Sequence, residues 1–389
     1  MAKKKGARGQ NEGNIRQRKD GTWEARYTAN GKQKSVYAKT RPEVSAKLTK
    51  ILNDINTGIF IEPTKTTVSS WLDTWFETYK KPTVKAKTLE CYYNIIEKHI
   101  KPAIGKYTLK DLRPEKVQKM YNDIAAKLSP RMAELTHITL RAALEQAVTN
   151  DLIVKNVTQK TKLPATTEKE RRVLTTDEQK KFMEALKGNR LEAAFILDLF
   201  SGLRVGELAA LRWKNIDLEN KIMNVSQTLY RVKNFDKDAQ TKTRLEFGTT
   251  KSHKGKRDIP LMDEVVAVLK AHKARQAAER LKVGELYHKE DEEGNRLVFC
   301  TQIGTPLEPR KISDEFYKII EKAEIPKANM HSLRHTFATR GLENGIELKV
   351  MQELLGHSTI TLTGDVYSHV LQDKKREAIG KLKSVFNKG

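Results

Sequence analysis

The chain has 389 residues, which is too long for a single hydrophobic core of ordinary size, so two or three domains are expected. Its 73 Lys and Arg residues outnumber 49 Asp and Glu, and the formal net charge of +24 favours a polyanionic partner such as nucleic acid. No apolar run approaches the roughly 20 residues of a membrane span, and no apolar segment follows the basic residues after Met1. These features exclude a membrane-spanning or secreted protein and predict a cytoplasmic one.

The two cysteines, Cys91 and Cys300, lie far apart and lack the spacing of metal ligands. A disulfide framework and a cysteine zinc site are therefore not supported. Both thiols are expected to be buried.

Residues 1–63 form the most basic segment, with 14 Lys and Arg against 6 Asp and Glu. Three short runs in it are separated by two pairs that favour tight hairpins, which predicts a three-stranded antiparallel sheet. The runs are residues 14–18, 23–28 and 32–39, and the pairs are Asp20-Gly21 and Asn30-Gly31.

Alternation in the second run predicts that this sheet has one apolar and one polar face. A capping-box pattern from Thr40 to Glu43 then precedes apolar residues at helical spacing, so a helix is expected to cover the apolar face. The polar face could enter a DNA groove, or it could be a solvated basic surface. The candidate DNA-binding residues for this face are Arg16, Arg18, Arg26, Lys32 and Lys34.

Residues 64–164 carry four helical patterns and are expected to form an all-α bundle. Trp71 and Trp75 lie four residues apart, a spacing more typical of a helical core than of a base-stacking surface. Lys85 and Lys87 follow an inter-helix loop and are candidates for phosphate contacts, although they could also only keep the loop soluble. The patterns cover residues 68–79, 88–100, 114–128 and 130–150.

A charged linker with a proline precedes the last domain, residues 165–389, which is expected to be mainly helical with a small antiparallel sheet. A glycine turn at Ser201 to Leu203 separates its second and third helices. The helices are expected at 176–186, 191–200, from about 204, and at 263–282, 311–323, 332–344 and 347–355, and the strands at 216–225, 245–250 and 257–261.

Two arginines in this domain could bind one phosphodiester. His331 and Arg334 are three residues apart at a helix start, so they share a face, and Arg204 follows the glycine turn. Two guanidinium groups could neutralise both non-bridging oxygens of one phosphate. Either arginine alone would more often be a surface salt-bridge partner.

Residues 250–261 are expected to form a basic hairpin, whose Lys251 could protonate a leaving 5′ oxygen or contact a phosphate. Tyr367 lies ten residues after His357, in a segment rich in Thr and Gly, and could act as an oxygen nucleophile. His331 and His335 have a spacing that zinc ligands can have, but no third ligand clusters with them, so no metal site is predicted. His335 and His369 are expected to support or pack the site.

Taken together, these motifs resemble the signature of the tyrosine recombinases in order and spacing. The resemblance is strongest to integrases of phages and conjugative transposons, and it covers the chain from about residue 14 to the end. It rests on Arg204 within Ser201 to Leu208, Lys251 in its basic segment, His331 to His335, Leu355 to His357, and Tyr367 to His369.

The resemblance implies a role for each matching position. Tyr367 would be the nucleophile, and Arg204 and Arg334 would clamp the phosphate. Lys251 and His331 would transfer protons, while His357 would hydrogen-bond the phosphate and buttress the site. The three domains would be an arm-type DNA-binding domain, a core-binding domain and a catalytic domain.

The implied reaction is site-specific recombination of a mobile element, through a 3′-phosphotyrosine and a Holliday junction, with no metal or nucleotide cofactor. The implied partners are double-stranded DNA at core and arm-type sites, three further copies of the chain, and an accessory DNA-bending or excision factor, in a bacterial cytoplasm at the nucleoid. A type IB topoisomerase would use the same chemistry within one duplex. A DNA-binding regulator with a vestigial site is the second alternative.

Overall fold

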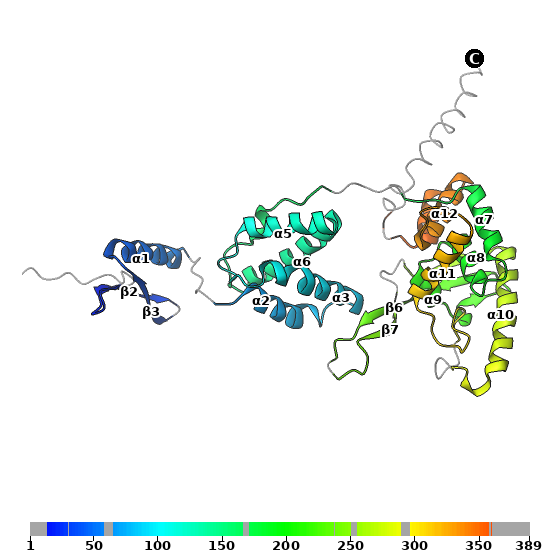
Figure 1. The fold of residues 1–389 in the computed structure, drawn as a ribbon, viewed down its shortest axis with the longest axis horizontal. Helices are drawn as coiled ribbons and strands as arrows, with labels where there is room; N and C mark the ends of the chain where they lie inside the picture. Colours follow the sequence, from blue (N-terminus) through cyan, green and yellow to red (C-terminus); the bar gives the residue numbers. More distant parts are fainter. Residues whose placement is uncertain are drawn as a thin grey trace, which may run out of the picture. The chain divides into compact units, whose positions relative to one another are not determined.

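The computed structural model describes residues 14–29, 31–57, 65–165, 171–236, 238–249, 255–288, 296–357 and 359. The chain divides into two compact units, Met1–Thr167 and Glu168–Gly389 (Figure 1). No helix in the described ranges is long and apolar enough to cross a bilayer. The expected multidomain architecture, with a three-stranded sheet at the N-terminus and mostly helical domains after it, is confirmed.

The N-terminal sheet has the order β1-β2-β3, with antiparallel pairing throughout. Helix α1 begins after Thr40, whose hydroxyl accepts a hydrogen bond from the Glu43 amide at 3.4 Å. The helix buries Val44 and Leu48 against Ala25 and Tyr27 of the sheet. The elements are β1 (Asn14–Gln17), β2 (Trp23–Ala29), β3 (Lys32–Ala38) and α1 (Arg41–Asn56).

The register of this sheet corrects the face predicted for two lysines. Lys34 pairs with Tyr27 and Lys32 pairs with Ala29, and residues directly opposite each other in an antiparallel pair point to the same face. Since Tyr27 and Ala29 are buried on the helix side, Lys32 and Lys34 belong to that side and not to the polar face. The error came from reading charge in β3 without its register.

The polar face of the sheet is organised around the buried carboxylate of Glu24. Arg16 Nε donates to Glu24 at 2.6 Å, Arg26 Nε at 3.2 Å and the Ser35 hydroxyl at 2.7 Å. Arg18 lies over the ring of Tyr37, 5.4 Å from its centroid. Arg16, Arg18 and Arg26 therefore lie on the predicted face.

The following residues form a helical bundle, as predicted. Trp71 and Trp75 are 3% and 1% exposed, and Trp71 Nε1 donates to the Ala143 carbonyl at 2.8 Å, so their assignment to the core is confirmed. Cys91 is exposed, which contradicts the expected burial of both thiols, whereas Cys300 is buried. The elements are α2 (Val68–Trp75), the π-helix η1 (Phe76–Lys80), α3 (Ala86–Ile95), the π-helix η2 (Ile96–Ile100), α4 (Lys101–Ile104), α5 (Pro114–Lys127), α6 (Pro130–Thr149) and η3 (Val157–Lys160).

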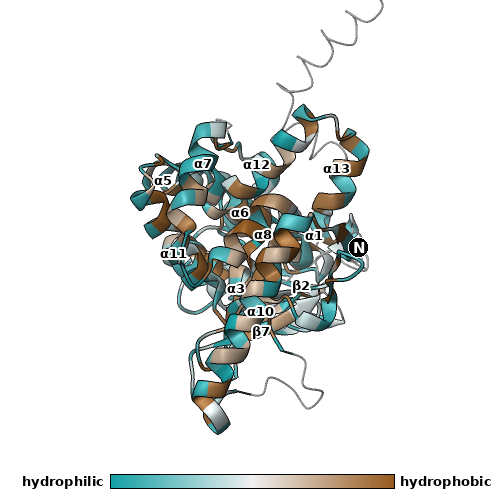
Figure 2. Cartoon of the chain, turned by 90° about the vertical axis from the view of Figure 1, so that its right-hand side faces the viewer, coloured by the Kyte–Doolittle hydropathy of each residue, from teal (hydrophilic) through white to brown (hydrophobic). Residues whose placement is uncertain are grey.

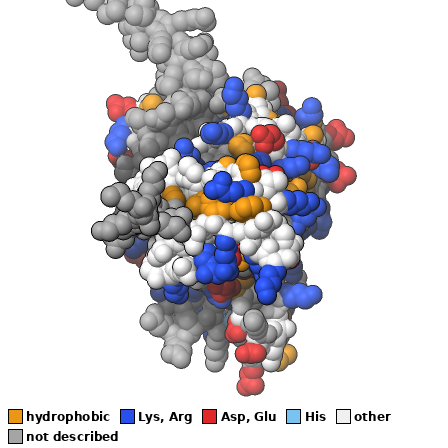
Figure 3. Space-filling view, turned by 90° about the vertical axis from the view of Figure 1, so that its left-hand side faces the viewer, with side chains coloured by type: hydrophobic (Ala, Val, Ile, Leu, Met, Phe, Trp, Pro, Cys, Tyr) orange, Lys and Arg blue, Asp and Glu red, His pale blue; other side chains and the backbone are white. Residues whose placement is uncertain are grey.

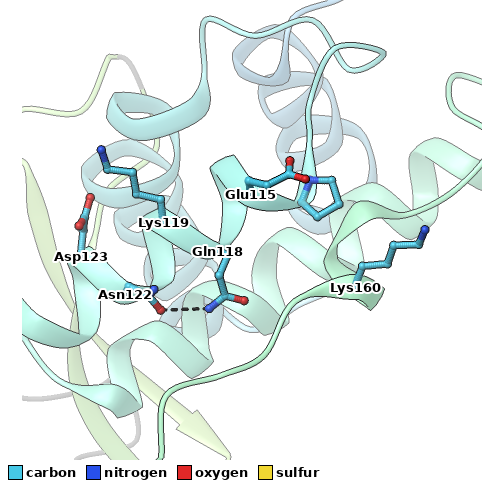
Figure 4. Close-up of a pocket in the computed structure, with 7 residues that line it drawn as sticks. Glu115, Gln118, Lys119, Asn122, Asp123 and Lys160 are labelled. Carbon is cyan, nitrogen blue, oxygen red and sulfur yellow. Dashed lines mark hydrogen bonds between the residues drawn. The ribbon is translucent and has the colours of Figure 1, made fainter.

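Helix α5 borders a pocket of about 520 Å³ that is lined mainly by polar side chains of this helix and by Lys160 (Figure 4). Gln118 in this pocket donates from Nε2 to the side-chain oxygen Oδ1 of Asn122 at 3.0 Å. It also brackets the backbone of Lys162: its Nε2 donates to the Lys162 carbonyl and its Oε1 accepts from the Lys162 amide, both at 2.8 Å. Gln118 thus fixes the chain where it leaves the bundle.

The second unit packs helices around a core to which the apolar helix α8 contributes (Figure 2). All the helices predicted for this unit are present, with ends shifted by one or two residues. They are α7 (Thr176–Leu186), α8 (Glu192–Ser201), α9 (Val205–Ala209), α10 (Asp263–Val283), α11 (Pro309–Lys322), α12 (Met330–Glu343) and α13 (Leu348–Leu355).

The strands of this unit pair differently from the prediction. β6 pairs with β7 in a two-stranded sheet, and β8 pairs with β5 beside β4, so β7 and β8 do not pair with each other. Strand β6 was not predicted from the sequence. It pairs with β7, the strand that the predicted hairpin would have paired with β8. The strands are β4 (Ile216–Asp217), β5 (Ile222–Val225), β6 (Gln227–Lys233), β7 (Thr243–Thr249) and β8 (Arg257–Pro260).

Candidate active site

The candidate site begins where α8 ends at Gly202. This residue has a left-handed backbone, with φ of 60°, and a Cβ there would lie 2.6 Å from a ring carbon of Phe337. Glycine is therefore required both by conformation and by space. The turn places Arg204 immediately before α9, with its side chain 42% exposed.

Glu207, one turn into α9, fixes Arg204 and is itself held by Arg257. Its carboxylate accepts Nη1 of Arg204 at 2.8 Å, the Arg204 backbone amide at 3.0 Å and Nη2 of Arg257 at 2.9 Å. Burial acts to raise the pKa of Glu207, but the charge of Arg257 and the hydrogen bonds outweigh it and lower that pKa to about 2. Glu207 is thus an ionised, buried support for an exposed guanidinium.

Arg334 comes from the first turns of α12 and is 1% exposed. Its Nη1 donates to the Gly202 carbonyl at 2.5 Å and its Nη2 to the Leu355 carbonyl at 2.6 Å. The guanidinium thereby joins the C-terminal ends of α8 and α13, where carbonyl groups favour a positive charge. Arg257 makes a parallel contact, with Nε 2.6 Å from the Leu354 carbonyl.

Three histidines surround these arginines. His331 and His335 stand edge to face, with ring centroids 4.6 Å apart, and His357 follows the end of α13 at Gly356. Partial desolvation, followed by the charges of Arg334 and Arg204, lowers the pKa of His331 to about 4 and that of His357 to about 3. Both rings are therefore neutral at neutral pH and able to accept a proton.

A buried carboxyl group, Asp198 of α8, interacts through its charge with Arg334 and was not anticipated from the sequence. Asp198 is 1% exposed, and neither of its oxygens has a hydrogen-bond partner in the described part of the chain. Burial raises its pKa well above the ordinary value, with Arg334 opposing the shift and Glu207 adding to it. Burial thus favours the protonated, neutral form of this carboxyl group.

Four of the six predicted catalytic residues thus meet in one place: Arg204, Arg334, His331 and His357. The other two, Lys251 and Tyr367, lie outside the described residues, as does His369. The sequence analysis missed Glu207 and Arg257. Glu207 could have been found, because it lies three residues after Arg204 in the same motif. Arg257 is a lone arginine in a strand and gave no comparable signal. No group of three or more His, Cys, Asp or Glu in the described ranges could hold a metal ion.

The predicted DNA-binding residues of the helical bundle are both exposed. Lys85 precedes α3, and Lys87 lies in its first turn with Nζ 2.7 Å from a Glu90 oxygen. An exposed pair of this kind is weak and could exchange its carboxylate for a phosphate. The role of these lysines in DNA binding stays a prediction, as does that of the sheet residues.

Residues 172–374 match a model of the phage integrase family, and residues 67–125 match a model of the phage integrase N-terminal SAM-like domain. A tyrosine recombinase described as XerC-like, from Caldanaerobacter subterraneus, is 31% identical over 368 residues, covering 92% of this chain and 93% of that protein. An integrase from Streptomyces ambofaciens is 27% identical and covers 90% of this chain and 88% of its own length.

Two solved structures are similar in fold. The integrase of transposon Tn1549 in complex with transposon right end DNA has a TM-score of 0.68 and 22% identity, covering 82% of this chain and all of that one. A lambda integrase tetramer bound to a Holliday junction has a TM-score of 0.58 and 21% identity, covering 93% of this chain and 96% of that one.

Proposed function

Because the chain belongs to the phage integrase family and is therefore a site-specific tyrosine recombinase, we propose that Tyr367 cleaves DNA at the cluster formed by Arg204, Arg334, His331 and His357. The phenol oxygen attacks the scissile phosphorus, and the bond from phosphorus to the 5′ oxygen breaks. The product is a 3′-phosphotyrosine with a free 5′-hydroxyl, and a partner strand's 5′-hydroxyl reverses the step. The ester conserves the bond energy, so neither nucleotide nor metal is needed.

Proton transfer in this scheme uses the neutral histidine and the lysine. His331 takes the proton of the Tyr367 phenol, and Lys251 donates one to the departing 5′ oxygen. In the free protein, partial burial and then the charges of Arg334 and Arg204 lower the pKa of His331 to about 4. A phosphate bound between those arginines would offset their charge and raise this pKa, which makes His331 a better base when substrate is present.

The observation that carries the proposal is the pairing of one exposed and one buried guanidinium at the same site. Arg334 has its orientation fixed by the carbonyls of Gly202 and Leu355, while Arg204 is fixed by Glu207 and keeps 42% of its side chain exposed. Preorganised donors of this kind stabilise the charge that develops on a phosphate during attack.

The other domains would deliver DNA to this site. Residues 1–63 are proposed as an arm-type DNA-binding domain, 64–164 as the core-binding domain and 165–389 as the catalytic domain. Lys and Arg side chains surround an apolar strip on the face shown in Figure 3, which suits contacts with a phosphate backbone. Strand exchange between two DNA sites would require four protomers, and an accessory DNA-bending or excision factor is a further expected partner.

A synthetic Holliday junction carrying the element's core site tests recombination against its main alternative. The recombinase should resolve the junction into both pairs of products, and should do so in EDTA. An enzyme that relaxes supercoiled DNA efficiently but leaves the junction intact would be a topoisomerase. Binding to the junction with no covalent intermediate would identify a non-catalytic regulator.

A further inference from the structure

The segment that enters the second unit is fixed against α12, the helix that carries His331 and Arg334. The Leu174 amide donates to the Thr336 hydroxyl at 2.9 Å, and the Leu174 carbonyl accepts from Nη2 of Arg340, also at 2.9 Å. Leu174 is fully buried. The chain therefore has a defined position and direction here, although it is neither helix nor strand.

The direction of the chain at Leu174 brings the residues that precede it toward the candidate site. The amide side of Leu174 faces Thr336, and its carbonyl side faces Arg340, one turn further along α12. Tracing the chain backward from Leu174 thus leads toward the N-terminal end of α12, where His335 and His331 lie. Arg171 is three residues upstream of Leu174, within about 10 Å of extended chain.

Arg171 and its neighbour Arg172 differ in what they bind. Arg172 donates to the carbonyls of Val173 and Pro326 and pairs with Glu178, so its guanidinium is committed to holding the segment. Arg171 is exposed, and no hydrogen bond or ion pair joins it to any other described residue. Arg171 thus directly precedes a residue whose side chain is held in place, and its own guanidinium is not committed to any described residue.

The charge of Arg171 reaches the site. Among the causes that lower the pKa of His331, the charge of Arg171 ranks after partial desolvation and the charges of Arg334 and Arg204. For the lowered pKa of His335, only desolvation and the charge of His331 have larger effects than Arg171. This agrees with the position derived from the hydrogen bonds of Leu174.

We propose that Arg171 binds a DNA backbone phosphate adjacent to the scissile one, so that the active site includes a residue from the segment with which the second unit begins. This inference rests on the proposed function. A planar guanidinium with free donors suits a phosphate oxygen pair, and neighbouring phosphates of one strand lie within the reach of an arginine beside His331. Arg171 also lies one residue outside the matched family range, at 172–374.

Single-phosphate neutralisation tests the contact. Suicide substrates are prepared with a neutral methylphosphonate at one phosphate at a time on either side of the scissile step, and covalent-complex formation is timed for the full-length protein and Arg171→Ala. We expect Arg171→Ala to slow cleavage about tenfold on unmodified DNA. At one flanking position, neutralisation should slow the unsubstituted protein similarly but leave the variant almost unaffected.

Two variants serve as controls. Arg171→Lys should recover part of the rate, since charge remains but the fork is lost. Lys270→Ala removes an exposed charge from α10 that is not among the charges with the largest effect on His331, and should leave cleavage within twofold of the unsubstituted rate. Thermal melting of Arg171→Ala should be unchanged because the side chain has no partner to lose.

The proposal is overturned if Arg171→Ala cleaves at the unsubstituted rate. It is also overturned if, at every flanking position, neutralising the phosphate slows the Arg171→Ala variant by the same factor as the unsubstituted protein. Failure of the proposed function looks different, because the unsubstituted protein would then form no covalent complex on any substrate.

Discussion

Arg257 donates from Nη2 to Oε2 of Glu207 across 2.9 Å, and both side chains are at most 5% exposed. The same carboxylate orients Arg204 through its other oxygen. Arg257 therefore acts on Arg204, the proposed phosphate-binding residue, through Glu207. The pair is both a support for the candidate site and a buried charge balance for the second unit.

Replacing Arg257 by Ala removes the buried ion-pair partner of Glu207 and leaves its carboxylate only the contacts with the half-exposed Arg204, which should lower the free energy of unfolding of the second unit by about 3–5 kcal/mol. Glu207→Gln removes the charge but keeps the shape, so the double variant Arg257→Ala with Glu207→Gln should lose less than Arg257→Ala alone. Urea denaturation followed by fluorescence measures all three. Equal losses in the single and double variants would show that packing, and not charge, sets the cost.

The pH dependence of stability should also reveal Glu207. Its pKa is lowered from an ordinary 4.5 to about 2, so the unfolded state binds the proton more readily. The stability that it contributes is complete above about pH 4.5 and is lost as the pH falls toward 2. The melting temperature of Glu207→Gln should therefore change less with pH over that interval than the melting temperature of the unsubstituted protein. An equal change with pH in the two proteins would contradict this prediction.

Asp198 should show the opposite sign, since burial raises its pKa well above the ordinary 3.8. Folding then favours the protonated form, and the stability of the unsubstituted protein should fall as the pH rises above about 4. Asp198→Asn, which is neutral and nearly isosteric, should melt at a higher temperature than the unsubstituted protein at neutral pH. This difference in melting temperature should shrink as the pH falls toward 4. A difference that grows on acidification would show that Asp198 is an ionised partner of Arg334.

The sequence predicted well what depends on local periodicity. The helices of both units and the three-stranded sheet follow from apolar spacing and turn pairs, and the glycine turn before Arg204 was visible as a motif. Long-range pairing could not be read in the same way. Strand β6 and its pairing with β7 were missed because that pairing joins segments separated by a long loop. Lys32 and Lys34 were assigned to the wrong face for a different reason: the tight turn at Asn30-Gly31 pairs Lys32 with Ala29 and Lys34 with Tyr27, and this register was not carried into β3.

The candidate site was predictable only in its charged motifs. Arg204, Arg334, His331 and His357 were identified, but the supporting residues Arg257 and Asp198 were not. Their importance arises from burial and from partners 50 to 136 residues away along the chain. A lone arginine in a strand or an aspartate in an apolar helix has no local signal that distinguishes it.

Arg204→Lys keeps a positive charge but loses the planar fork that both pairs with Glu207 and faces the site. We expect DNA affinity near that of the unsubstituted protein, with cleavage slower by about a hundredfold or more, because the guanidinium acts mainly on the charge that develops during attack. Electrophoretic mobility shift and single-turnover cleavage on the same duplex separate the two effects. Equal losses in both would identify Arg204 as a phosphate anchor only.

Removal of residues 1–63 should leave core-site cleavage intact and abolish integration that depends on a second, distant DNA site. The segment is a separate basic sheet domain, with Arg16, Arg18 and Arg26 on one face. Each phosphate contact that is lost should also reduce the salt dependence of arm-site binding by about one unit of slope. Normal integration by the truncated protein would refute the arm-binding assignment.

The central claim is that Tyr367 forms the covalent bond to DNA, and one trapping experiment tests it directly. A nicked suicide substrate with a label on the 3′ side lets the short 5′ fragment diffuse away, so the attached protein accumulates as a labelled band under denaturing conditions. The account predicts that this band forms in EDTA, disappears on protease treatment, and is absent for Tyr367→Phe although that variant still folds and binds DNA. A covalent band formed by Tyr367→Phe would contradict the assignment of the nucleophile, and a band that requires a divalent metal would contradict the mechanism.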